Sequence, residues 1–482
     1  MEMKILIANR GEIACRVLKT LRELDISSVA VYSPADENAP HVWLADEAFP
    51  LTNNRGYLDI GEIIEIAKEN GVHGIHPGYG FLAENVKFAQ ACMDASITFI
   101  GPSMKSMSAF GDKREARILA ESVGVSLIPG AEKCESPEDA QSIAGTLGYP
   151  ILLKAAAGGG GKGMRRASCL DELDGAFESA RREAESSFGD GRLLIEKYIY
   201  PARHIEVQVL GDSTGIHIVG ERECSLQRRY QKVIEEAPAS SITDETRSRL
   251  YRDVTKLLMA VGYEGAGTVE FLVGPDGSHY FLEVNTRLQV EHPVTEFITG
   301  MDLVAEQIRI AFGGLASAIP RPRGYAIEAR LNAEDPYQGY LPQVGVLEGL
   351  SFPHWPQVRI DSGVEQGSEV TPHYDSMIAK VIAYGATRQE ARNRLRGALL
   401  EISILGVRTN QHFLSDILDR DFFVAGETYT TTIDTETFEE SAIPTFLEGL
   451  VAEAKSYKPT KSIGSEAEQS SPWVDLGRFR IG

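Results

Sequence analysis

Cysteine is scarce in this sequence and follows no metal-binding pattern. The 482 residues include only five cysteines, an odd number, and no two of them have the CxxC spacing of a zinc site. Scattered cysteines in odd number do not make a complete disulfide framework. We therefore expect free thiols in a reducing compartment at Cys15, Cys92, Cys134, Cys169 and Cys224.

Long apolar runs are also missing. The first apolar run covers only Ile5 to Ala8 before Asn9 and Arg10, which is too short for a signal peptide. No later segment approaches the ~18 continuous apolar residues that a membrane span needs. The expectation is a cytoplasmic protein that begins with a β-strand and has no membrane partner.

Basic charge is in short supply as well. The sequence has 48 Lys and Arg against 69 Asp and Glu, and its formal net charge is -21. Affinity for a nucleic acid comes largely from Lys and Arg that displace counterions, so nucleic acid is not an expected partner. A local basic pocket for a nucleotide stays compatible with this composition.

The length and the apolar pattern predict several domains. Short β-branched runs first alternate with amphipathic stretches, which indicates an α/β domain with a parallel sheet covered by helices on both faces. Strands dominate later, which is typical of a mixed α+β region. We expect an N-terminal α/β domain, a helical connector, a small second unit, a mixed domain and a polar tail or linker at residues 1–100, 101–129, 130–199, 200–446 and 447–482.

A charged segment, residues 283–291, has the alternation of a β-strand. Side chains on a strand alternate faces with period two, so its charged and amide side chains would share one face. The apolar Leu288 and Val290 would lie on the other face. The polar face would carry Glu283, Asn285, Arg287, Gln289 and Glu291.

A hairpin places a further carboxylate beside this segment. The Gly-Pro-Asp-Gly turn at residues 274–277 separates two strand-like runs, and it brings Glu270 close to Glu283. Two facing carboxylates repel unless a cation lies between them. With Asn285 as a third oxygen ligand, the set predicts a Mg²⁺ site completed by phosphate oxygens and water. The alternative is an exposed sheet face with scattered salt bridges.

The loop after Lys154 is unusually rich in glycine. Four consecutive glycines cost backbone entropy, which favours a need for close approach or motion. The loop is not a Walker A motif, because the residue after Lys162 is neither Ser nor Thr. We interpret it as a flap whose N–H groups close over phosphates, with Lys113, Lys154 and Lys162 as positive charges. A flexible turn is the alternative.

Residues 78–83 match the dinucleotide pattern GxGxxA. They do not open the first strand–helix unit, and no acid stands at a convincing strand end about 20 residues later. We interpret the segment as a tight turn and not as a nicotinamide site.

Taken together, these segments resemble those of biotin carboxylases, the ATP-grasp component of biotin-dependent acyl-CoA and pyruvate carboxylases. The resemblance covers residues 1 to about 446. It implies that the N-terminal doubly wound domain is followed by an ATP-grasp fold with a small lid and a larger C-terminal domain. The motifs occur in the family's order: HPGYGFLAEN, KAAAGGGGKGM, EKYI, RHIEVQV, CSLQRRYQKVIEEAPA, GTVEF, FLEVNTRLQVEHPVTE and EARLNAEDP.

The resemblance implies a role for each matching position. Glu291 would be the general base, and Arg330 would face the ureido oxygen of biotin. Mg²⁺ or Mn²⁺ would be held by Glu270 and Glu283, with Asn285 beside them. Bicarbonate would be bound by Lys232, Arg287, Gln289 and the backbone of Val290. ATP would be bound by Lys113, Lys154, Gly158, Gly159, Gly160, Gly161, Glu196, Lys197, Ile199, His204, Gln227, Tyr230, Glu270 and Glu283.

The implied reaction is carboxylation of biotin N1 through carboxyphosphate, at the expense of ATP and bicarbonate. The sequence has no A-M-K-M biotinylation motif, so biotin would arrive on a carrier protein or domain. The other implied partners are a second copy of this chain, in a homodimer, and a carboxyltransferase subunit. Tyr230 departs from the familiar histidine or asparagine. An ATP-grasp ligase that joins a carboxylate to an amine and a non-catalytic scaffold are the alternatives.

Overall fold

A computed structural model describes residues 3–156 and 163–440 of this chain. The chain divides into two units, residues 1–438 and 439–482, and the fold below belongs to the first. None of the helices in the described part of the chain has the length and apolar character of a membrane span.

The first layer is a five-stranded sheet in the order β3-β2-β1-β4-β5, and every pair in it is parallel. Strand order reverses at β1, which is the doubly wound arrangement that the sequence predicts. The strands are β1 (Lys4–Ile7), β2 (Ser27–Tyr32), β3 (Glu47–Pro50), β4 (Gly74–His76) and β5 (Thr98–Phe99). The helices of this region are α1 (Gly11–Glu23), α2 (Pro40–Leu44), α3 (Ile60–Glu69) and α4 (Val86–Asp94), with short η1 (Pro34–Asp36) and η2 (Gly56–Leu58).

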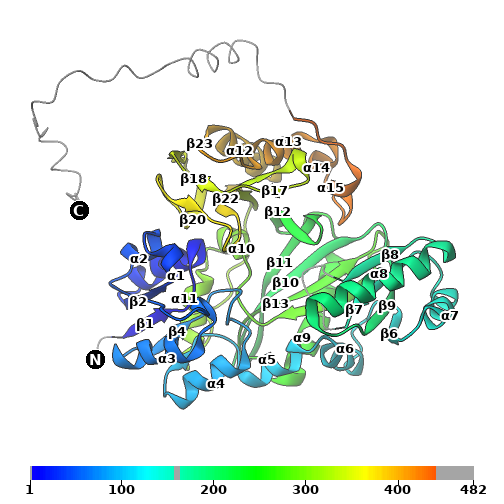
Figure 1. The fold of residues 1–482 in the computed structure, drawn as a ribbon, viewed down its shortest axis with the longest axis horizontal. Helices are drawn as coiled ribbons and strands as arrows, with labels where there is room; N and C mark the ends of the chain where they lie inside the picture. The colour runs from blue at the N-terminus through cyan, green and yellow to red at the C-terminus, as the bar shows by residue number, and fades with distance from the viewer. Residues whose placement is uncertain (1–2, 157–162, 441–482) are drawn as a thin grey trace, which may run out of the picture. The chain divides into compact units, whose positions relative to one another are not determined.

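Two helices, α5 (Met104–Gly111) and α6 (Lys113–Ser122), lead to a small antiparallel sheet of order β6-β9-β7-β8. Ser136 caps the first helix of this unit by accepting a hydrogen bond from the N–H of Asp139, and Gly148 ends that helix with φ +71°. The elements are β6 (Gly130–Cys134), α7 (Pro137–Leu147), β7 (Ile151–Ala155), β8 (Met164–Ala167), α8 (Leu170–Phe188) and β9 (Leu193–Lys197) (Figure 1).

An eight-stranded antiparallel sheet forms the largest layer, in the order β14-β13-β10-β11-β12-β15-β22-β20. Its strands are β10 (Arg203–Asp212), β11 (Gly215–Arg228), β12 (Gln231–Ala237), β13 (Gly265–Val273), β14 (His279–Asn285), β15 (Tyr325–Asn332), β20 (Val358–Ser362) and β22 (Met377–Gly385). Its helices are α9 (Asp244–Val261), α10 (His292–Thr299), α11 (Leu303–Ala311), α12 (Arg388–Glu401), α13 (Gln411–Asp419), α14 (Asp421–Ala425) and α15 (Thr432–Thr435).

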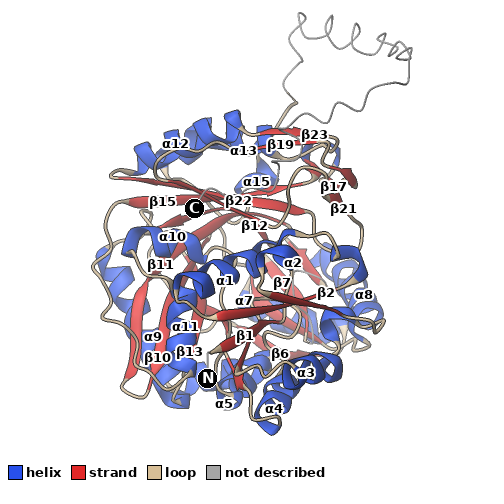
Figure 2. Ribbon diagram, turned by 90° about the vertical axis from the view of Figure 1, so that its left-hand side faces the viewer, coloured by secondary structure: helices blue, strands red, loops and turns tan. Residues whose placement is uncertain are grey.

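Separate apolar clusters hold these layers. Figure 2 shows α12 and α13 above β15 and β22, where Leu395, Leu399 and Phe413 pack on Ile327 and Val381. The remaining short elements are β16 (Glu334–Asp335), η3 (Pro336–Gln338), β17 (Leu341–Pro342), β18 (Gly345–Val346), β19 (Gly349–Ser351), β21 (Glu369–Val370) and β23 (Ser403–Leu405).

The hairpin predicted from the turn at residues 274–277 is confirmed. Strands β13 and β14 pair antiparallel, and Glu270 stands directly opposite Glu283. The prediction of one continuous strand through Glu291 is wrong, because β14 ends at Asn285. The backbone N–H of Thr286 instead donates to Glu84 Oε1 at 3.0 Å, a residue that belongs to the N-terminal region. A long-range hydrogen bond therefore takes the place of a strand ladder.

Candidate active site

The centre of the site is the ammonium group of Lys232, which lies among three carboxylates. It donates to Glu206 Oε2 at 2.5 Å, to Glu291 Oε1 at 2.6 Å and to Glu270 Oε1 at 2.9 Å. These residues come from β12, β10, β13 and the residue before α10, so four separate segments meet at one cation. Glu206 and Glu291 have no solvent exposure. The alternative of a solvated sheet face is therefore wrong.

Electrostatics keep this cluster charged. Burial opposes charge on Lys232, Glu270 and Glu291, but the neighbouring opposite charges outweigh it. The three carboxylates hold the pKa of Lys232 well above its usual range. Lys232 and His204 lower the pKa of Glu270. Lys232 and Arg330 hold the pKa of Glu291 well below its usual range. At neutral pH Lys232, Glu270 and Glu291 are therefore ionised.

The segment after β14 brings its odd-numbered side chains to this network, although it is not a strand. Gln289 donates to Glu270 Oε1 at 2.8 Å, and Asn285 donates to the same oxygen at 3.0 Å. Arg287 donates to Asn285 Oδ1 at 3.0 Å and to Glu84 Oε2 at 3.0 Å. The predicted grouping of these side chains is confirmed, while its predicted cause, strand alternation, applies only as far as Asn285.

Glu291 stands immediately before α10 and is held from two sides. Arg330 on β15 donates to Glu291 Oε2 at 2.9 Å and to Glu235 Oε1 at 2.6 Å. Lys232 takes the other oxygen of Glu291. Each oxygen of this buried carboxylate therefore accepts a hydrogen bond from a cation.

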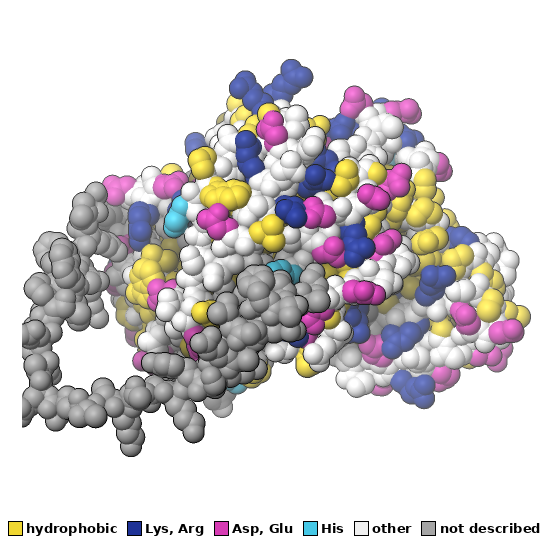
Figure 3. All heavy atoms as spheres, turned by 90° about the horizontal axis from the view of Figure 1, so that it is seen from above, with side chains coloured by type: hydrophobic (Ala, Val, Ile, Leu, Met, Phe, Trp, Pro, Cys, Tyr) yellow, Lys and Arg dark blue, Asp and Glu magenta, His cyan; other side chains and the backbone are white. Residues whose placement is uncertain are grey.

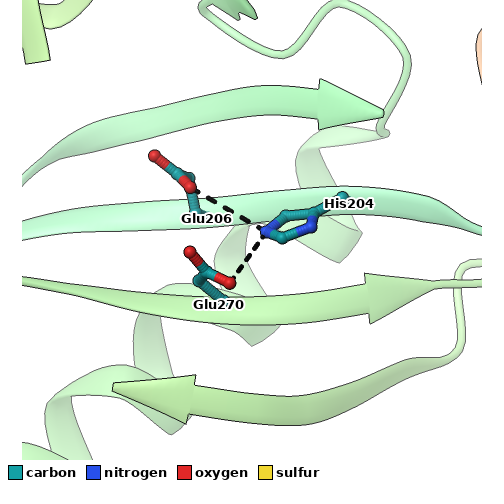
Figure 4. Close-up of side chains that lie close together, drawn as sticks. All are labelled: His204, Glu206 and Glu270. Atoms are coloured by element: carbon teal, nitrogen blue, oxygen red, sulfur yellow. Dashed lines mark ion pairs between the residues drawn. The ribbon is translucent and has the colours of Figure 1, made fainter. Parts of the chain in front are cut away.

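A group of possible metal ligands lies at the same place. His204, Glu206 and Glu270 have ligand atoms within 4.8 Å of one another (Figure 4). Glu270 is also opposite Glu283, whose Oε2 lies 3.0 Å from the ammonium group of Lys113. Carboxylate and amide oxygens are the ligands that a hard divalent cation prefers, so Glu270, Glu283 and Asn285 fit Mg²⁺ or Mn²⁺.

The small sheet supplies a second charged group. Lys154 and Arg117 both form ion pairs with Glu196, whose side chain is almost fully buried. Lys197 donates to the carbonyl oxygens of Gly148 and Tyr149 at 3.1 and 2.9 Å. Glu196 and Lys197 are the last two residues of β9. The predicted flap residues Gly158, Gly159, Gly160 and Gly161, together with Lys162, lie outside the described residues.

Three further residues that were predicted to contact the nucleotide lie between Lys197 and Lys232 in the sequence. Ile199 is half-buried just after β9, and Gln227 donates to the carbonyl oxygen of Cys224 at 3.5 Å. Tyr230 is half-exposed in the two-residue turn between β11 and β12 and has φ +66°, as its neighbour Arg229 has φ +47°. This turn places left-handed backbone on two residues that are not glycine.

Two residues beside Lys232 were not predicted from the sequence. They are Glu206, which accepts a hydrogen bond from Lys232, and Arg222, which pairs with Glu206. Glu206 also accepts from Arg222 Nε at 2.5 Å, and the fully buried Arg222 donates to Gln208 and Thr295 at 2.8 and 3.0 Å. The signal was present in RHIEVQVLG, where His204, Glu206 and Gln208 alternate with apolar residues. Period-two alternation, as in residues 283–291, puts His204, Glu206 and Gln208 on one face, whereas Arg222 lies outside this segment.

The N-terminal sheet opens a cavity of about 440 Å³ at the carboxyl ends of β1 and β4, the place where ligands bind to doubly wound sheets. The predicted tight turn is confirmed, since Gly78 and Gly80 have φ +63° and +68°. Tyr79 from this turn donates to Glu12, and Lys380 lies 3.1 Å from Glu12. Lys380 also donates to the carbonyl oxygen of Val290 at 2.9 Å. Lys380 thus connects Glu12, which lines the cavity, to the loop that contains Val290 and Glu291.

Comparison with known families first defines a class. Residues 112–317 match the ATP-binding domain of the carbamoyl-phosphate synthase L chain. This is the region that contains Lys113, Lys154 and the network around Lys232. The chain is therefore an ATP-binding enzyme of the ATP-grasp class.

The flanking regions define the family. Residues 1–107 match the biotin carboxylase N-terminal domain, and residues 328–435 match the biotin carboxylase C-terminal domain. The chain belongs to the biotin carboxylases, ATP-dependent ligases that form a C–N bond and use ATP, Mg²⁺ and biotin.

Individual relatives agree with this assignment. The chain is 46% identical to biotin carboxylase 1 of Bacillus subtilis, over 90% of this chain and 98% of that one. It is 45% identical to the biotin-dependent acyl-coenzyme A carboxylase alpha3 subunit of Mycobacterium leprae, over 96% of this chain and 79% of that one. A biotin carboxylase complex from Campylobacter jejuni matches with a TM-score of 0.87 at 41% identity, over 90% of this chain and 99% of that one.

A second solved structure contains the ligands that the site residues predict. It is the biotin carboxylase domain dimer of 2-oxoglutarate carboxylase from Hydrogenobacter thermophilus, in complex with MgADP, ADP and bicarbonate. The match has a TM-score of 0.86 at 44% identity, and it covers 91% of this chain and all of that one.

Proposed function

We propose that this chain carboxylates biotin N1 with Glu291 as the general base. The observation that carries the proposal is the double cationic contact of Glu291, from Lys232 at 2.6 Å and from Arg330 at 2.9 Å. A carboxylate with a depressed pKa is ionised and ready to accept a proton, but it is a weak base.

Substrate binding resolves this difficulty. Lys232 and Arg330 are the two groups that would bind bicarbonate and the ureido oxygen of biotin. Once these substrates draw the two cations away from Glu291, the pKa of its carboxyl group rises and it becomes the stronger base. The proton of bicarbonate then passes to Glu291, and the resulting carbonate attacks the γ-phosphate of ATP, which forms carboxyphosphate and releases ADP as the leaving group.

The remaining polar groups would position the reactants. Arg287 has a planar guanidinium that suits bidentate contact with carbonate, and Gln289 and the backbone of Val290 complete that contact. Glu270 and Glu283, with Asn285 beside them, would hold Mg²⁺ or Mn²⁺. Bound there, the metal would neutralise charge on the transferred phosphoryl group. Carboxyphosphate would break down to CO₂ and phosphate, and the phosphate would accept the N1 proton of biotin. N1 would then bond to the carbon of CO₂, while Arg330 stabilises the ureido anion.

The nucleotide would lie between the two sheets' charged groups. We assign phosphate contacts to Lys113, Lys154 and Gly158 to Gly161, and contacts with adenine to the segment Glu196, Lys197 and Ile199. His204, Gln227 and Tyr230 would contact ribose and phosphate. The domain boundaries that we propose remain 1–100, 101–129, 130–199, 200–446 and 447–482.

The proposed partners are a biotin carrier, a second copy of this chain and a carboxyltransferase subunit. A dimer of a biotin carboxylase domain among the solved structures supports the second copy. Relatives at similar identity are named for pyruvate, propionyl-CoA and methylcrotonoyl-CoA. We infer that the choice of acceptor lies outside this chain. The five free thiols support a cytoplasmic location. Figure 3 shows one face of the molecule, on which acidic and basic side chains are interspersed.

The deciding assay is bicarbonate-dependent release of ADP, measured with and without free biotin. We expect release to require bicarbonate and to rise with biotin. Release that required an amine and ignored bicarbonate would instead identify a carboxylate–amine ligase. No release under any of these conditions, in a protein that binds ATP, would identify a non-catalytic scaffold.

A further inference from the structure

Two glutamates with no solvent exposure face each other beside Arg330. Glu235 on β12 and Glu328 on β15 are register partners in the antiparallel ladder, so their side chains lie on the same face of the sheet. Side chains at directly opposite positions have Cβ atoms about 5 Å apart. Two carboxylates at this separation in a buried sheet do not both ionise.

Among the residues that the structure describes, a cation is in hydrogen-bond contact with Glu235 but not with Glu328. Glu235 Oε1 accepts from Arg330 Nε at 2.6 Å, whereas Glu235 Oε2 and both oxygens of Glu328 have no hydrogen-bond partner within the described part of the chain. Lys380 faces Arg330 across the ladder, but it contacts Glu12 at 3.1 Å and the carbonyl of Val290 at 2.9 Å.

The surroundings of Glu328 favour its neutral form. On the other side of β15 its register partner is Ile382, and the neighbouring positions Ala326 and Ala237 belong to an apolar cluster with Val294 and Ile298 of α10. The charged groups that act on Glu328 are Lys380, Glu235, Arg330 and Glu291. Burial and the two nearby carboxylates outweigh the two cations and raise the pKa of Glu328 well above its usual range.

We propose that Glu328 is a protonated positioning residue, which donates its carboxyl proton to the unpaired oxygen of Glu235 and so keeps the other oxygen of Glu235 on Arg330. Arg330 then keeps its contact with Glu235 when the biotin oxygen draws the guanidinium away from Glu291. The kinetic consequence rests on the proposed function of Arg330. The protonation of Glu328 does not.

The first test is the pH dependence of thermal stability in the full chain. The unfolded chain ionises Glu328 above about pH 4.3, while the folded chain keeps the proton. The folded state therefore binds more protons, and wild-type stability falls relative to Glu328→Gln as the pH rises from 5.5 to 8.5. We expect the melting temperature of Glu328→Gln minus that of wild type to grow by roughly 1 to 2 °C per pH unit.

Controls make this result specific. Glu348→Gln changes an exposed glutamate of the same region and should show a constant difference. Glu328→Leu also removes the titrating group, so it replaces Glu328→Gln if the amide variant does not fold. In a Glu235→Gln background the opposing charge is absent, and the pH-dependent effect of Glu328→Gln should shrink. A difference that is constant with pH in both Glu328 variants would show an ionised Glu328 and overturn the proposal.

Kinetics test the positioning role. Glu328→Gln keeps a hydrogen-bond donor for Glu235 and should stay within about threefold of wild type in biotin-stimulated kcat/KM. Glu328→Leu removes the donor and should lose on the order of tenfold, the value of one hydrogen bond to a charged group, with KM for ATP unchanged. Equal kcat/KM in the two variants would overturn the positioning role. If Glu291→Ala stays active while the melting difference grows with pH, the proposed function fails and the protonated Glu328 stands.

Discussion

The eight-stranded sheet and the small sheet of residues 130–197 both carry many charges, but the ion pairs around Lys232 and the pair of Lys133 with Glu135 differ in their exposure to water. In the large sheet the side chain of Lys232 is 12% exposed, and its ammonium group contacts three glutamates whose side chains are at most 8% exposed. In the small sheet Lys133 pairs with Glu135, and the two side chains are 76% and 65% exposed. Water screens the second pair and not the first. Residues of the same type are therefore buried and mutually paired around Lys232, whereas the Lys133–Glu135 pair of the small sheet is exposed to water.

The largest expected effect concerns the base. Glu291→Ala removes the proposed proton acceptor, and we expect bicarbonate-dependent ADP release to fall by about 10²- to 10⁴-fold, the usual contribution of general base catalysis. The matched control is Glu135→Ala in the small sheet, which should stay within twofold of wild type. A rate for Glu291→Ala within a few-fold of wild type would show that the base is assigned wrongly.

The next prediction compares the effects of Lys232 in the large sheet and Lys133 in the small sheet on the free energy of unfolding. Lys232→Met leaves Glu206, Glu270 and Glu291 without their shared cation, and we expect a loss of about 3 to 5 kcal/mol in the free energy of unfolding. Lys133→Met breaks only an exposed pair and should change it by less than about 1 kcal/mol. Urea unfolding measures both. Equal effects in the two variants would show that the buried ion pairs of Lys232 stabilise the fold no more than the exposed pair of Lys133 does.

Metal dependence separates two carboxylates of one hairpin. Glu270 is buried and accepts from Lys232, Asn285 and Gln289, whereas the side chain of Glu283 is 37% exposed and pairs with Lys113. We expect Glu270→Gln to raise the Mg²⁺ concentration for half-maximal ADP release by roughly tenfold or more, and Glu283→Gln to raise it less. Titration of Mg²⁺ at saturating ATP measures this. Unchanged metal dependence in both variants would exclude the site.

Acid stability follows from the depressed pKa values of the large sheet. The lowered pKa of Glu270 means that the folded chain binds fewer protons than the unfolded chain near pH 4. Its stabilising effect is complete above the unfolded value of about 4.3 and is lost as the pH falls through the lower folded value.

We expect the melting temperature of wild type to fall between pH 5 and pH 3.5, and that of Glu270→Gln to start lower at pH 7 but to fall less. Circular dichroism melts over this range provide the measurement. Parallel curves for the two proteins would show that Glu270 has an ordinary pKa in the folded chain.

The smallest effect concerns the turn between β11 and β12. Tyr230 has φ +66°, and asparagine tolerates this left-handed backbone better than tyrosine does. We expect Tyr230→Asn to increase the free energy of unfolding by up to about 1 kcal/mol and to change KM for ATP by only a few-fold, because the side chain is half-exposed. Thermal melts and ATP titrations test the two parts separately. A loss of stability would show that contacts of the tyrosine ring outweigh the backbone strain.

Local patterns in the sequence were sufficient for the hairpin and its register. The turn at residues 274–277 and the two flanking strands predict that Glu270 faces Glu283, and the structure has this pair. Such contacts are close in sequence, so turn chemistry and strand alternation determine them. The end of β14 was predicted wrongly, because the hydrogen bond from Thr286 to Glu84 spans about two hundred residues.

The sequence by itself determined the polar residue types, their order and the family to which the chain belongs. The tertiary structure decided which of them are buried and which cation each carboxylate contacts. Lys232 meets Glu206, Glu270 and Glu291 only because β12, β10, β13 and the start of α10 converge. Charge pairing depends on distance and on exclusion of water, and both are properties of the packed sheet and not of the order of residues.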